Sequence, residues 1–443
     1  MDAAISVWTS CVDLPNFAPM PLGLKTDVLI IGGGMAGILC AYYLKQVGVQ
    51  CSLVEAKTVC SGVTENTTAK ITSQHGLIYH KLLKEFGPEK AKQYYCANEQ
   101  AVEQYRLLSQ RYDFSWEEKN NYVYSRDNFQ KLYKELEALQ SLKIPAQYQK
   151  SLPLPFRVAG AVEFPHQAQM NPLKLVNALL EDLTVYEHTR ALEINGSQVV
   201  TDRGKIQAEH VIVATHFPFL NLHGSYVLKL YQHRSYVLAL EHGPQIGGMY
   251  VDEAQTGLSF RNAGTYLLLG GGGHRTGKQS GAWRQLREFA GRHYPDAQER
   301  CHWAAQDCMS LDGVPYIGRY CAKTPNVYVA TGFQKWGMTS SMVAAQLLRD
   351  MILGADNEYE ALFSPQRTML RPQLAANAIS AAVNLLTPTA PRCPHMGCAL
   401  TWNKQERSWD CPCHGSRFDE AGQLLDNPAT GDLKKTPQPK KIG

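Results

Sequence analysis

Cysteine and histidine side chains crowd together near the C-terminal end of the chain. A Cys-x-His motif is followed, after fifteen further residues, by a Cys-x2-His motif, and each motif has one additional cysteine close by. The residues are Cys393, His395, Cys398, Cys411, Cys413 and His414. Thiolates and neutral imidazoles at such short spacing are good ligands for zinc and for iron–sulfur clusters. The pattern therefore predicts a metal centre held by two loops, and by itself leaves zinc and a metal-free remnant as alternatives.

Three glycines near the N-terminal end have the spacing of a dinucleotide-binding turn. Gly32, Gly34 and Gly37 form G-x-G-x-x-G after an apolar strand at 26–31 and before a helix at 38–47. The first glycine permits a tight turn, the second lets the backbone approach a pyrophosphate, and the third lets the helix pack on the strand. The helix N-terminus offers free N–H groups to the phosphates. We therefore expect a dinucleotide here, with a glycine-rich turn that binds nothing as the alternative.

An acidic residue and the lack of a second glycine motif indicate which dinucleotide binds. Glu55 ends the next strand, 18 residues after Gly37, where a carboxylate can accept the ribose hydroxyls of an adenosine. The other glycine cluster, at 270–273, does not have glycines at the required spacing. A flavoenzyme that reduces its flavin with a nicotinamide cofactor normally has two such motifs. The single motif therefore favours FAD over NAD.

The elements that must position these groups alternate between strands and helices. Buried strands are expected at 209–215 and 327–332, charged helices at 82–113 and 128–141, strands of a second sheet at 229–240 and 265–270, and an apolar-striped helix from 337 to 352. The chain has 443 residues, with 44 basic and 40 acidic side chains, so nothing suggests nucleic-acid binding. No transmembrane segment or secretory signal stands out, so we expect a cytoplasmic protein without a general disulfide framework.

Four motifs together resemble one family of flavoenzymes. They are TDVLIIGGGMAG at 26–37, SGVTENTTAK at 61–70, DGVPYIG at 312–318 and TGFQKWGMT at 331–339. With them the chain resembles the D-amino-acid oxidase/glycine oxidase/sarcosine oxidase family of FAD enzymes over residues 26–353. The resemblance implies an α/β (two-lobed α+β) fold, in which a Rossmann-like FAD-binding domain is joined to an antiparallel-sheet substrate domain.

The same resemblance implies where FAD is held. The implied contacts are Gly32, Gly34, Met35, Ala36, Gly37, Glu55, Thr67, Thr68, Lys70, Thr215, Gly332, Phe333, Trp336, Gly337 and Met338. In this family the turn matching Gly332 to Met338 faces the flavin pyrimidine, and the positive end of the following helix stabilises negative charge there. Some relatives tether flavin through a cysteine, and Cys308 lies in the neighbourhood. Its spacing fits poorly, so we expect FAD to be bound non-covalently.

The family resemblance also implies the type of substrate. Its members oxidise a carbon that bears an amine, by hydride transfer to the flavin, which requires orientation more than a strong base. An amino-acid substrate would also need a cation for its carboxylate. We select Arg261, His274 and Lys335 as catalytic candidates, with Arg275 and Lys70 as further cations. For each of them a packing or surface role is the alternative.

The C-terminal motifs closely resemble the Rieske iron–sulfur module. This resemblance implies a [2Fe-2S] cluster with Cys393 and Cys411 on one iron and His395 and His414 on the other. It also implies a disulfide between Cys398 and Cys413, and a covering proline loop at 427–431. Few residues precede the first motif, so the base sheet of the module is expected to be shortened. The cluster is then either shielded by the flavin domain or more exposed than usual.

These resemblances predict a domain plan. Residues 1–378 form an FAD-dependent oxidoreductase with FAD-binding segments at about 26–80, 155–220 and 305–355 and a substrate lobe between them. Residues 379–390 form a linker, and residues 391–443 form a shortened all-β Rieske domain.

The expected function is a dehydrogenase of an amine or amino acid that passes electrons singly from FAD to its own Rieske cluster. A one-electron acceptor, a ferredoxin-like protein or a quinone, would then receive them. The alternative is an electron-transfer or redox-sensing protein with no amine substrate of its own. A Rieske-type oxygenase would need a mononuclear iron site with two histidines and a carboxylate, and no such group of residues is recognisable.

Overall fold

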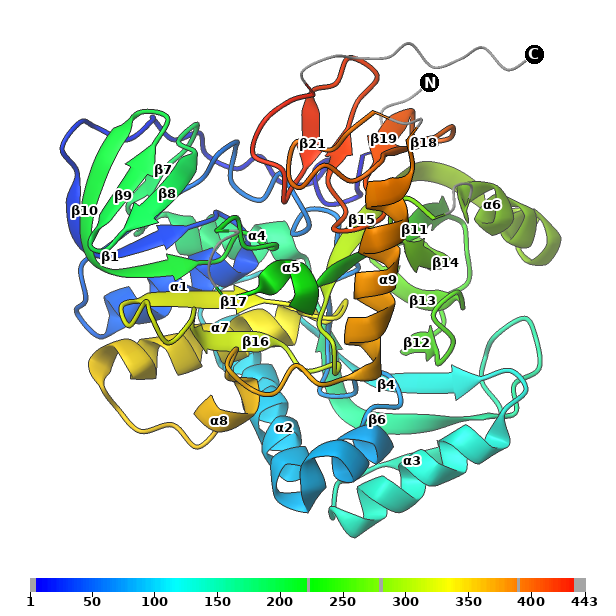
Figure 1. Cartoon of the computed structure of the whole chain (residues 1–443). Helices are drawn as coiled ribbons and strands as arrows, with labels where there is room; N and C mark the ends of the chain where they lie inside the picture. Colours follow the sequence, from blue (N-terminus) through cyan, green and yellow to red (C-terminus); the bar gives the residue numbers. More distant parts are fainter. Residues whose placement is uncertain (1–4, 221–223, 279–281, 389–390, 434–443) are drawn as a thin grey trace.

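A computed structural model describes residues 5–220, 224–278, 282–388 and 391–433. Figure 1 shows three parts: a sheet flanked by helices, a larger sheet beside it, and a small C-terminal β module that lies across both. Within the described residues, no helix combines the length and apolar character needed to span a bilayer.

The first sheet is the Rossmann-like part. Its strand order is β16 (Tyr316–Arg319), β17 (Val327–Thr331), β10 (Gly204–Val213), β1 (Lys25–Ile31), β2 (Cys51–Val54) and β7 (Val185–Tyr186), and β9 (Gln198–Thr201) joins β10 to β8 (Ala191–Asn195). The central strands β17, β10, β1, β2 and β7 are parallel. Strands buried on both faces read as continuous apolar runs, which is how β1 and β17 were recognisable in the sequence.

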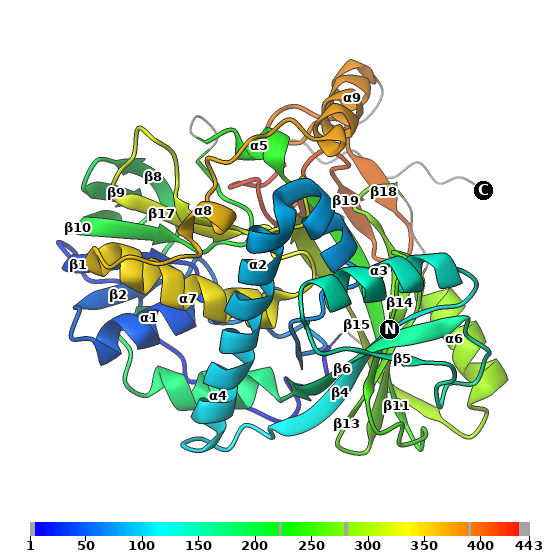
Figure 2. The ribbon, with the colours of Figure 1, turned by 90° about the horizontal axis from the view of Figure 1, so that it is seen from below.

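Helices cover this sheet. They are α1 (Met35–Gln46), α2 (Tyr79–Ser109), α4 (Pro172–Leu180), α7 (Gly337–Leu353) and α8 (Glu360–Phe363). Figure 2 shows α1 and α7 lying next to each other, and the two helices are in contact. Both begin at a glycine-containing turn after a strand, so both direct an N-terminus toward the carboxyl ends of the parallel strands. Ligands of open α/β sheets bind at that edge.

The second sheet forms the other lobe. Its order is β15 (Gln298–Met309), β11 (Tyr231–Glu241), β14 (Tyr266–Arg275), β13 (Ser259–Ala263), β12 (Met249–Asp252), β4 (Glu117–Ser125), β6 (Gly160–Gln169) and β3 (Lys70–Ile71), with β5 (Gln147–Gln149) beside β6. All pairs are antiparallel except β4 with β12. The predicted FAD-binding segments 26–80 and 155–220 therefore each extend into this sheet, through β3 and β6. Helices α3 (Phe129–Ser141) and α6 (Ala282–His293) pack on it.

The C-terminal module contains a four-stranded antiparallel sheet. Its strands are β18 (Thr401–Asn403), β19 (Ser408–Asp410), β20 (Arg417–Phe418) and β21 (Leu424–Asp426). The module's small core includes Trp409 and Phe418 together with the motif cysteines. The sheet is short, as expected, and a helix stands before the first motif.

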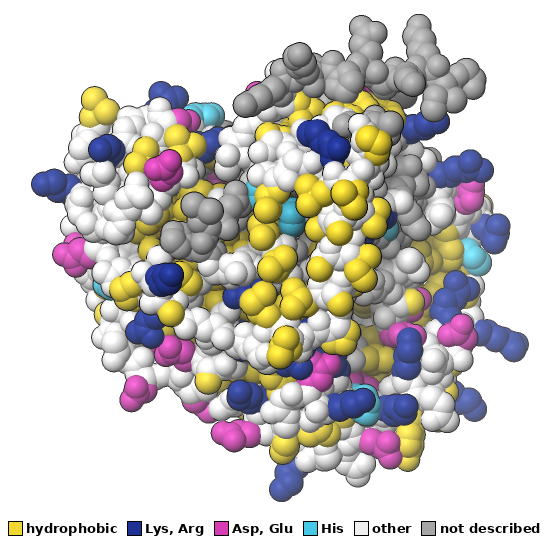
Figure 3. Space-filling view, in the orientation of Figure 1, with side chains coloured by type: hydrophobic (Ala, Val, Ile, Leu, Met, Phe, Trp, Pro, Cys, Tyr) yellow, Lys and Arg dark blue, Asp and Glu magenta, His cyan; other side chains and the backbone are white. Residues whose placement is uncertain are grey.

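That helix, α9 (Pro372–Leu386), runs through the first part of the predicted linker at 379–390. It carries no charged side chain, and only Asn377 is buried. Outward positions such as Ile379, Val383 and Leu386 are exposed. Figure 3 shows an apolar surface over α9 and over the short helix α5 (Tyr226–Lys229) beside it. The segment that connects the larger domain to the C-terminal module is therefore a helix in contact with α5, not an extended linker.

Candidate functional site

One cavity of about 570 Å³ lies between the two large sheets. Its size suits a cofactor or drug-sized ligand. Fourteen of the fifteen predicted FAD contacts line it: Gly32, Gly34, Met35, Ala36, Glu55, Thr67, Thr68, Lys70, Thr215, Gly332, Phe333, Trp336, Gly337 and Met338. The fifteenth, Gly37, lies behind the turn. The sequence motifs therefore converge on one cavity, although they are spread over three hundred residues.

The glycines have the close contacts that the motif requires. Gly32 has a φ of +114°, and a Cβ there would lie 2.6 Å from the carbonyl oxygen of Ala214. A Cβ on Gly37 would lie 2.0 Å from the carbonyl oxygen of Gly32, so this glycine lets α1 pack against the turn. Gly34 faces the cavity, where a side chain would enter the ligand's space. These positions fit a bound pyrophosphate.

Hydrogen bonds hold the carboxylate of Glu55 against the glycine turn. One of its carboxylate oxygens accepts a hydrogen bond from the N–H of Gly33 at 2.8 Å, and the other from the N–H of Lys57 at 2.8 Å. Each carboxylate oxygen can accept a further hydrogen bond, and Glu55 lines the cavity. The carboxylate therefore suits the ribose hydroxyls of FAD, as its position in the sequence predicted.

Three of the predicted cationic side chains contact other parts of the protein instead of the cavity. Arg261 is buried, and its guanidinium donates to the carbonyl oxygens of Thr68 and Ala69. His274 is buried between its own strand and Tyr236, whose hydroxyl lies 3.0 Å from the imidazole Nε2. Arg275 donates to carbonyl oxygens of the C-terminal module. None of the three lines the cavity.

Lys335 and Lys70 do line the cavity. Burial lowers the pKa of Lys70 to about 7, and its ammonium donates to the hydroxyl of Thr68 at 3.1 Å. Burial also lowers the pKa of Lys335, while the nearby Asp307 raises it. Asp307 was not selected from the sequence. Side chains alternate between the two faces of β15, and this alternation places Asp307 in the cavity wall. The same alternation would identify Asp307 from the sequence once the strand is known.

The same alternation places Cys308 on the other face of β15. Its thiol packs in an apolar cluster behind the first sheet and lies 3.6 Å from the hydroxyl of Thr331. Burial raises the thiol's pKa to about 12. The side chain does not line the cavity. This position supports non-covalent FAD, in agreement with the poor spacing noted in the sequence.

The four predicted cluster ligands come together in the C-terminal module. The imidazole rings of His395 and His414 lie 5.0 Å apart between centroids and are perpendicular. Burial lowers the pKa of His395 to about 3 and that of His414 to about 4, so both rings are neutral, the form that binds metals. Cys393 and Cys411 are both buried, and their thiols interact with each other.

His414 has the arrangement of a metal ligand. Its Nε2 lies 3.1 Å from the carbonyl oxygen of Val227 in α5, whereas its Nδ1 is buried without a hydrogen-bond partner among the described residues. A ligating histidine typically donates its other ring N–H to a backbone carbonyl or carboxylate. The flavin-side domain therefore orients a ligand of the cluster, and the residues present fit a [2Fe-2S] centre.

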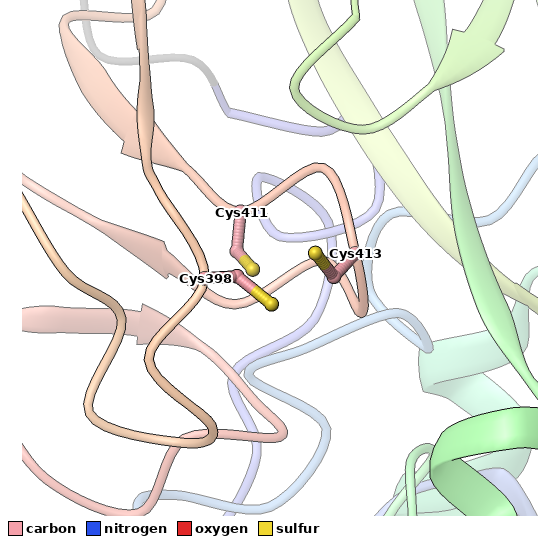
Figure 4. Close-up of side chains that lie close together, drawn as sticks. All are labelled: Cys398, Cys411 and Cys413. Atoms are coloured by element: carbon pink, nitrogen blue, oxygen red, sulfur yellow. The ribbon is translucent and has the colours of Figure 1, made fainter. Parts of the chain in front are cut away.

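The other two motif cysteines lie next to this site. Figure 4 shows Cys398 and Cys413 pointing toward Cys411, and the three sulfur atoms lie within 4.8 Å of one another. All three are free thiols in the structure. The disulfide between Cys398 and Cys413, implied by the resemblance, therefore stays a prediction, with its two sulfurs already adjacent.

The cluster loops lie directly against the flavin-side domain. Gln232 donates to the carbonyl oxygens of His414 and Asn427, and Gln306 donates to that of Gly415 at 2.9 Å. Arg275 donates to the carbonyl oxygens of Pro412 and Cys413. The motif cysteines and His414 are buried as a result. Of the two expected outcomes, shielding by the flavin domain is the one that the structure shows.

The covering loop also lines the cavity. Residues 424–430, which include β21 and most of the predicted proline loop at 427–431, line the same cavity as the glycine turn. The side chain of Asn427 donates to the carbonyl oxygens of Thr215 and Phe217, which follow β10. Phe217 packs edge-on against both cluster histidines. One short segment after β10 therefore contacts both sites.

Comparisons with known families agree with both sites. Residues 27–351 match the family described as FAD-dependent oxidoreductases, and residues 384–437 match the Rieske [2Fe-2S] domain. A protein of Bacillus subtilis (strain 168) that carries the name of a Rieske 2Fe-2S iron-sulfur protein, YhfW, is 34% identical over 98% of this chain and 98% of its own. The cytochrome b6-f complex iron-sulfur subunit of Nostoc punctiforme is 49% identical over 8% of this chain and 21% of its own.

Solved structures show the same fold in the larger domain. Glycine oxidase from Geobacillus kaustophilus superimposes with a TM-score of 0.66 and 20% identity, covering 78% of this chain and all of that one. L-proline dehydrogenase from P. horikoshii superimposes with a TM-score of 0.64 and 17% identity, covering 78% and 98%. At these identities the likeness concerns the fold.

Proposed function

The chain belongs to the family of FAD-dependent oxidoreductases and carries a Rieske [2Fe-2S] domain, and from this premise we propose that it oxidises an amine or amino acid and passes the electrons to its own cluster. Solved proteins of similar fold include a glycine oxidase and an L-proline dehydrogenase, which act on amino acids. FAD, when bound, supplies a two-electron acceptor, and the cluster supplies a carrier of single electrons.

The observation that carries this proposal is the wall shared by the two sites. The segment 424–430, formed by β21 and most of the cluster-covering loop, lines the same cavity as the glycine turn. Phe217 contacts both cluster histidines two residues after the cavity-lining Thr215. A module that served only as a distant partner would not need to complete the cavity. The short path through covalent and hydrogen bonds supports electron transfer within one chain.

The protein's own residues prepare the cavity for this chemistry. Gly34 and the N-terminus of α1 receive the phosphates, and Glu55 receives the ribose. The N-terminus of α7, at Gly337, lines the far end of the cavity and offers a positive dipole end to negative charge on a ring bound there. Residues 424–430 of the C-terminal module complete part of the wall of this cavity.

The test is anaerobic mixing of the holoprotein with a panel of D- and L-amino acids and N-methyl amines. We expect one class of compound to bleach the flavin absorbance and then to produce the EPR signal of a reduced Rieske cluster. The matched variant Cys393→Ser, which lacks a cluster ligand, should still show flavin bleaching but should turn over slowly with a one-electron dye. Bleaching without any cluster signal, or equal dye turnover in both proteins, would contradict transfer to the cluster.

A second candidate remains from the sequence. A redox-sensing protein without an amine substrate is favoured if no member of the panel bleaches the flavin while the cluster still titrates reversibly. The acceptor proposed for the dehydrogenase function is a ferredoxin-like protein or a quinone, since the cluster releases one electron at a time.

A further inference from the structure

Helix α9 has two faces with different surroundings. On its inner face, Asn377 is buried and donates to the carbonyl oxygen of Leu228 at 3.2 Å, and the carbonyl oxygen of Asn384 accepts a hydrogen bond from the N–H of Ala399. Its outer face is exposed, and no charged residue occurs anywhere in the helix. Figure 2 shows α9 projecting beyond α5 and the C-terminal module, so the outer face is accessible to another molecule.

The exposed residues of this outer face have two sizes. Four are large and apolar, with exposed fractions of 65%, 57%, 48% and 82%: Ile379, Val383, Leu385 and Leu386. Four are exposed alanines: Ala375, Ala376, Ala378 and Ala382. One stripe of the face has the alternating three- and four-residue steps of a coiled-coil seam. Its residues are Ala375, Ile379, Ala382 and Leu386.

The apolar surface around α9 is larger than monomeric proteins usually expose. Leu370, two residues before the helix, is 84% exposed, and Leu228 of α5, which contacts α9, is 40% exposed. At about 100 Å² for each large apolar side chain, these residues and the outer face of α9 expose roughly 700 Å². The largest apolar patch of a typical monomer is about 300–600 Å². A stable interface of standard size buries about 800 Å² on each partner, so a second molecule on this surface would have the contact area that it needs.

The outer face is complementary to itself when two copies of α9 run antiparallel. With a twofold axis between positions 380 and 381, each large side chain of one helix meets an alanine of the other. The pairs are Ile379 with Ala382, Leu386 with Ala375, Val383 with Ala378, and Leu385 with Ala376. Large side chains opposite small ones fill the space between two elements without overlap. A parallel pairing would instead place Ile379 against its own copy and leave a gap at Ala382.

We propose that α9 is the interface of a homodimer, in which the α9 helices of two copies of this chain pack antiparallel about a twofold axis. The inference is independent of the proposed oxidation. In an antiparallel pair the dipoles of the two helices also oppose each other, which is the favourable arrangement. A twofold axis uses the same surface on both subunits, and the self-complementary order of sizes along α9 meets that requirement.

The absence of charge favours a second copy over other occupants. Homodimer interfaces are more apolar than other protein surfaces, and their cores are depleted of charged residues. A helix that lies on a membrane surface normally carries lysine or arginine beside its apolar stripe, and α9 carries neither.

The test is sedimentation equilibrium of the holoprotein at micromolar concentrations. We expect a mass of twice that of the chain. Ile379→Arg places an unpaired charge against Ala382 of the second copy, twice in each dimer, and should raise the dimer dissociation constant about 100-fold or more. A monomeric wild-type protein, or a dissociation constant that Ile379→Arg leaves unchanged, would overturn the proposal.

An exchange of side-chain sizes tests the antiparallel register. Ala382→Ile alone sets a large side chain against Ile379 of the second copy and should raise the dissociation constant about 10-fold or more. The double variant Ile379→Ala, Ala382→Ile again places large against small and should dimerise within a few fold of wild type. A double variant that dimerises no better than Ala382→Ile would overturn the antiparallel pairing.

Two controls separate this pairing from other effects. Leu353→Arg makes the same kind of change at a leucine of α7 that is 49% exposed, and it should leave the dissociation constant unchanged. The absorbance of FAD and of the cluster verifies that each variant is folded. Vesicles of phosphatidylcholine and phosphatidylglycerol test the other occupant: a monomeric protein that sediments with them, and no longer does so as Ile379→Arg, would assign the face to a membrane surface and overturn the homodimer.

Discussion

Replacing Glu406 by glutamine would test how the C-terminal module is held on the flavin-side domain. Glu406 precedes β19 and accepts hydrogen bonds from Arg234 of β11 at 2.7 and 2.8 Å and from the hydroxyl of Tyr236 at 2.8 Å. Within its own module it also pairs with Arg417 at 2.8 Å. The side chains of Arg234, Glu406 and Arg417 are 8%, 5% and 6% exposed, so the interaction is scarcely screened by solvent.

The pKa of Glu406 gives the magnitude. Burial alone would raise it, but the two arginines dominate and lower it from 4.5 to about 2. That depression corresponds to about 3 kcal/mol of folding free energy at neutral pH. Because the folded pKa is lower than the unfolded one, this stability is present above pH about 4.5 and is lost as the pH falls toward 2. Truncating one partner of a buried pair costs a similar amount, about 3–5 kcal/mol.

The assay is loss of the cluster's visible absorbance in a urea titration at pH 7. Glu406→Gln should lower the unfolding free energy of the module by about 3 kcal/mol, and the difference from wild type should begin to shrink below pH about 5. The control Glu420→Gln removes the same charge from the same module, but from an exposed pair with Arg407, and should cost less than about 1 kcal/mol. Equal effects of the two substitutions would refute the reasoning.

Three further predictions concern the FAD site, the composition of the cluster and the two cysteines next to it. Gly34→Val places a side chain where the pyrophosphate lies, so the purified variant should lose most of its FAD absorbance; full flavin content would contradict the placement. Metal and sulfide analysis should give two irons and two sulfides per chain, and His414→Cys should keep an assembled cluster with a lower potential, because an anionic ligand replaces a neutral one; one zinc without sulfide would refute the assignment. Titration of the denatured, non-reduced protein should detect ten thiols, the 12 cysteines less Cys398 and Cys413, and twelve would exclude their disulfide.

Much of the fold and of both sites could be predicted because the responsible residues carry local constraints. Gly32 and Gly37 are required by close backbone contacts, and the cluster ligands keep a short spacing along the chain. The helix expected at 38–47 begins earlier, at Met35, because the turn is tight enough for α1 to start directly at the phosphate position. Such features depend on residues that are close together in the sequence, so they can be recognised from the sequence alone.

The cavity wall formed by the second sheet could not be predicted in the same way. Asp307 becomes a cavity residue only through the register of β15 against β11, which pairs it with His233. Arg261 was selected as a cation for the substrate, but its guanidinium braces the backbone near Thr68, a contact between segments almost two hundred residues apart. The roles of these side chains depend on long-range pairing of strands, which residue type and spacing do not encode.

The many contacts between the C-terminal module and the flavin-side domain have a consequence for the rate of the proposed electron transfer. A module on a flexible hinge would have to move between its donor and its acceptor, and the viscosity of the solvent would then limit the rate of that movement. Here α9, the ion pairs of Arg234 and the backbone contacts of Gln232, Gln306 and Asn427 hold the module in place. In the proposed electron transfer these contacts would keep the gap between the two centres fixed, so glycerol or sucrose added to the solution should leave that rate unchanged.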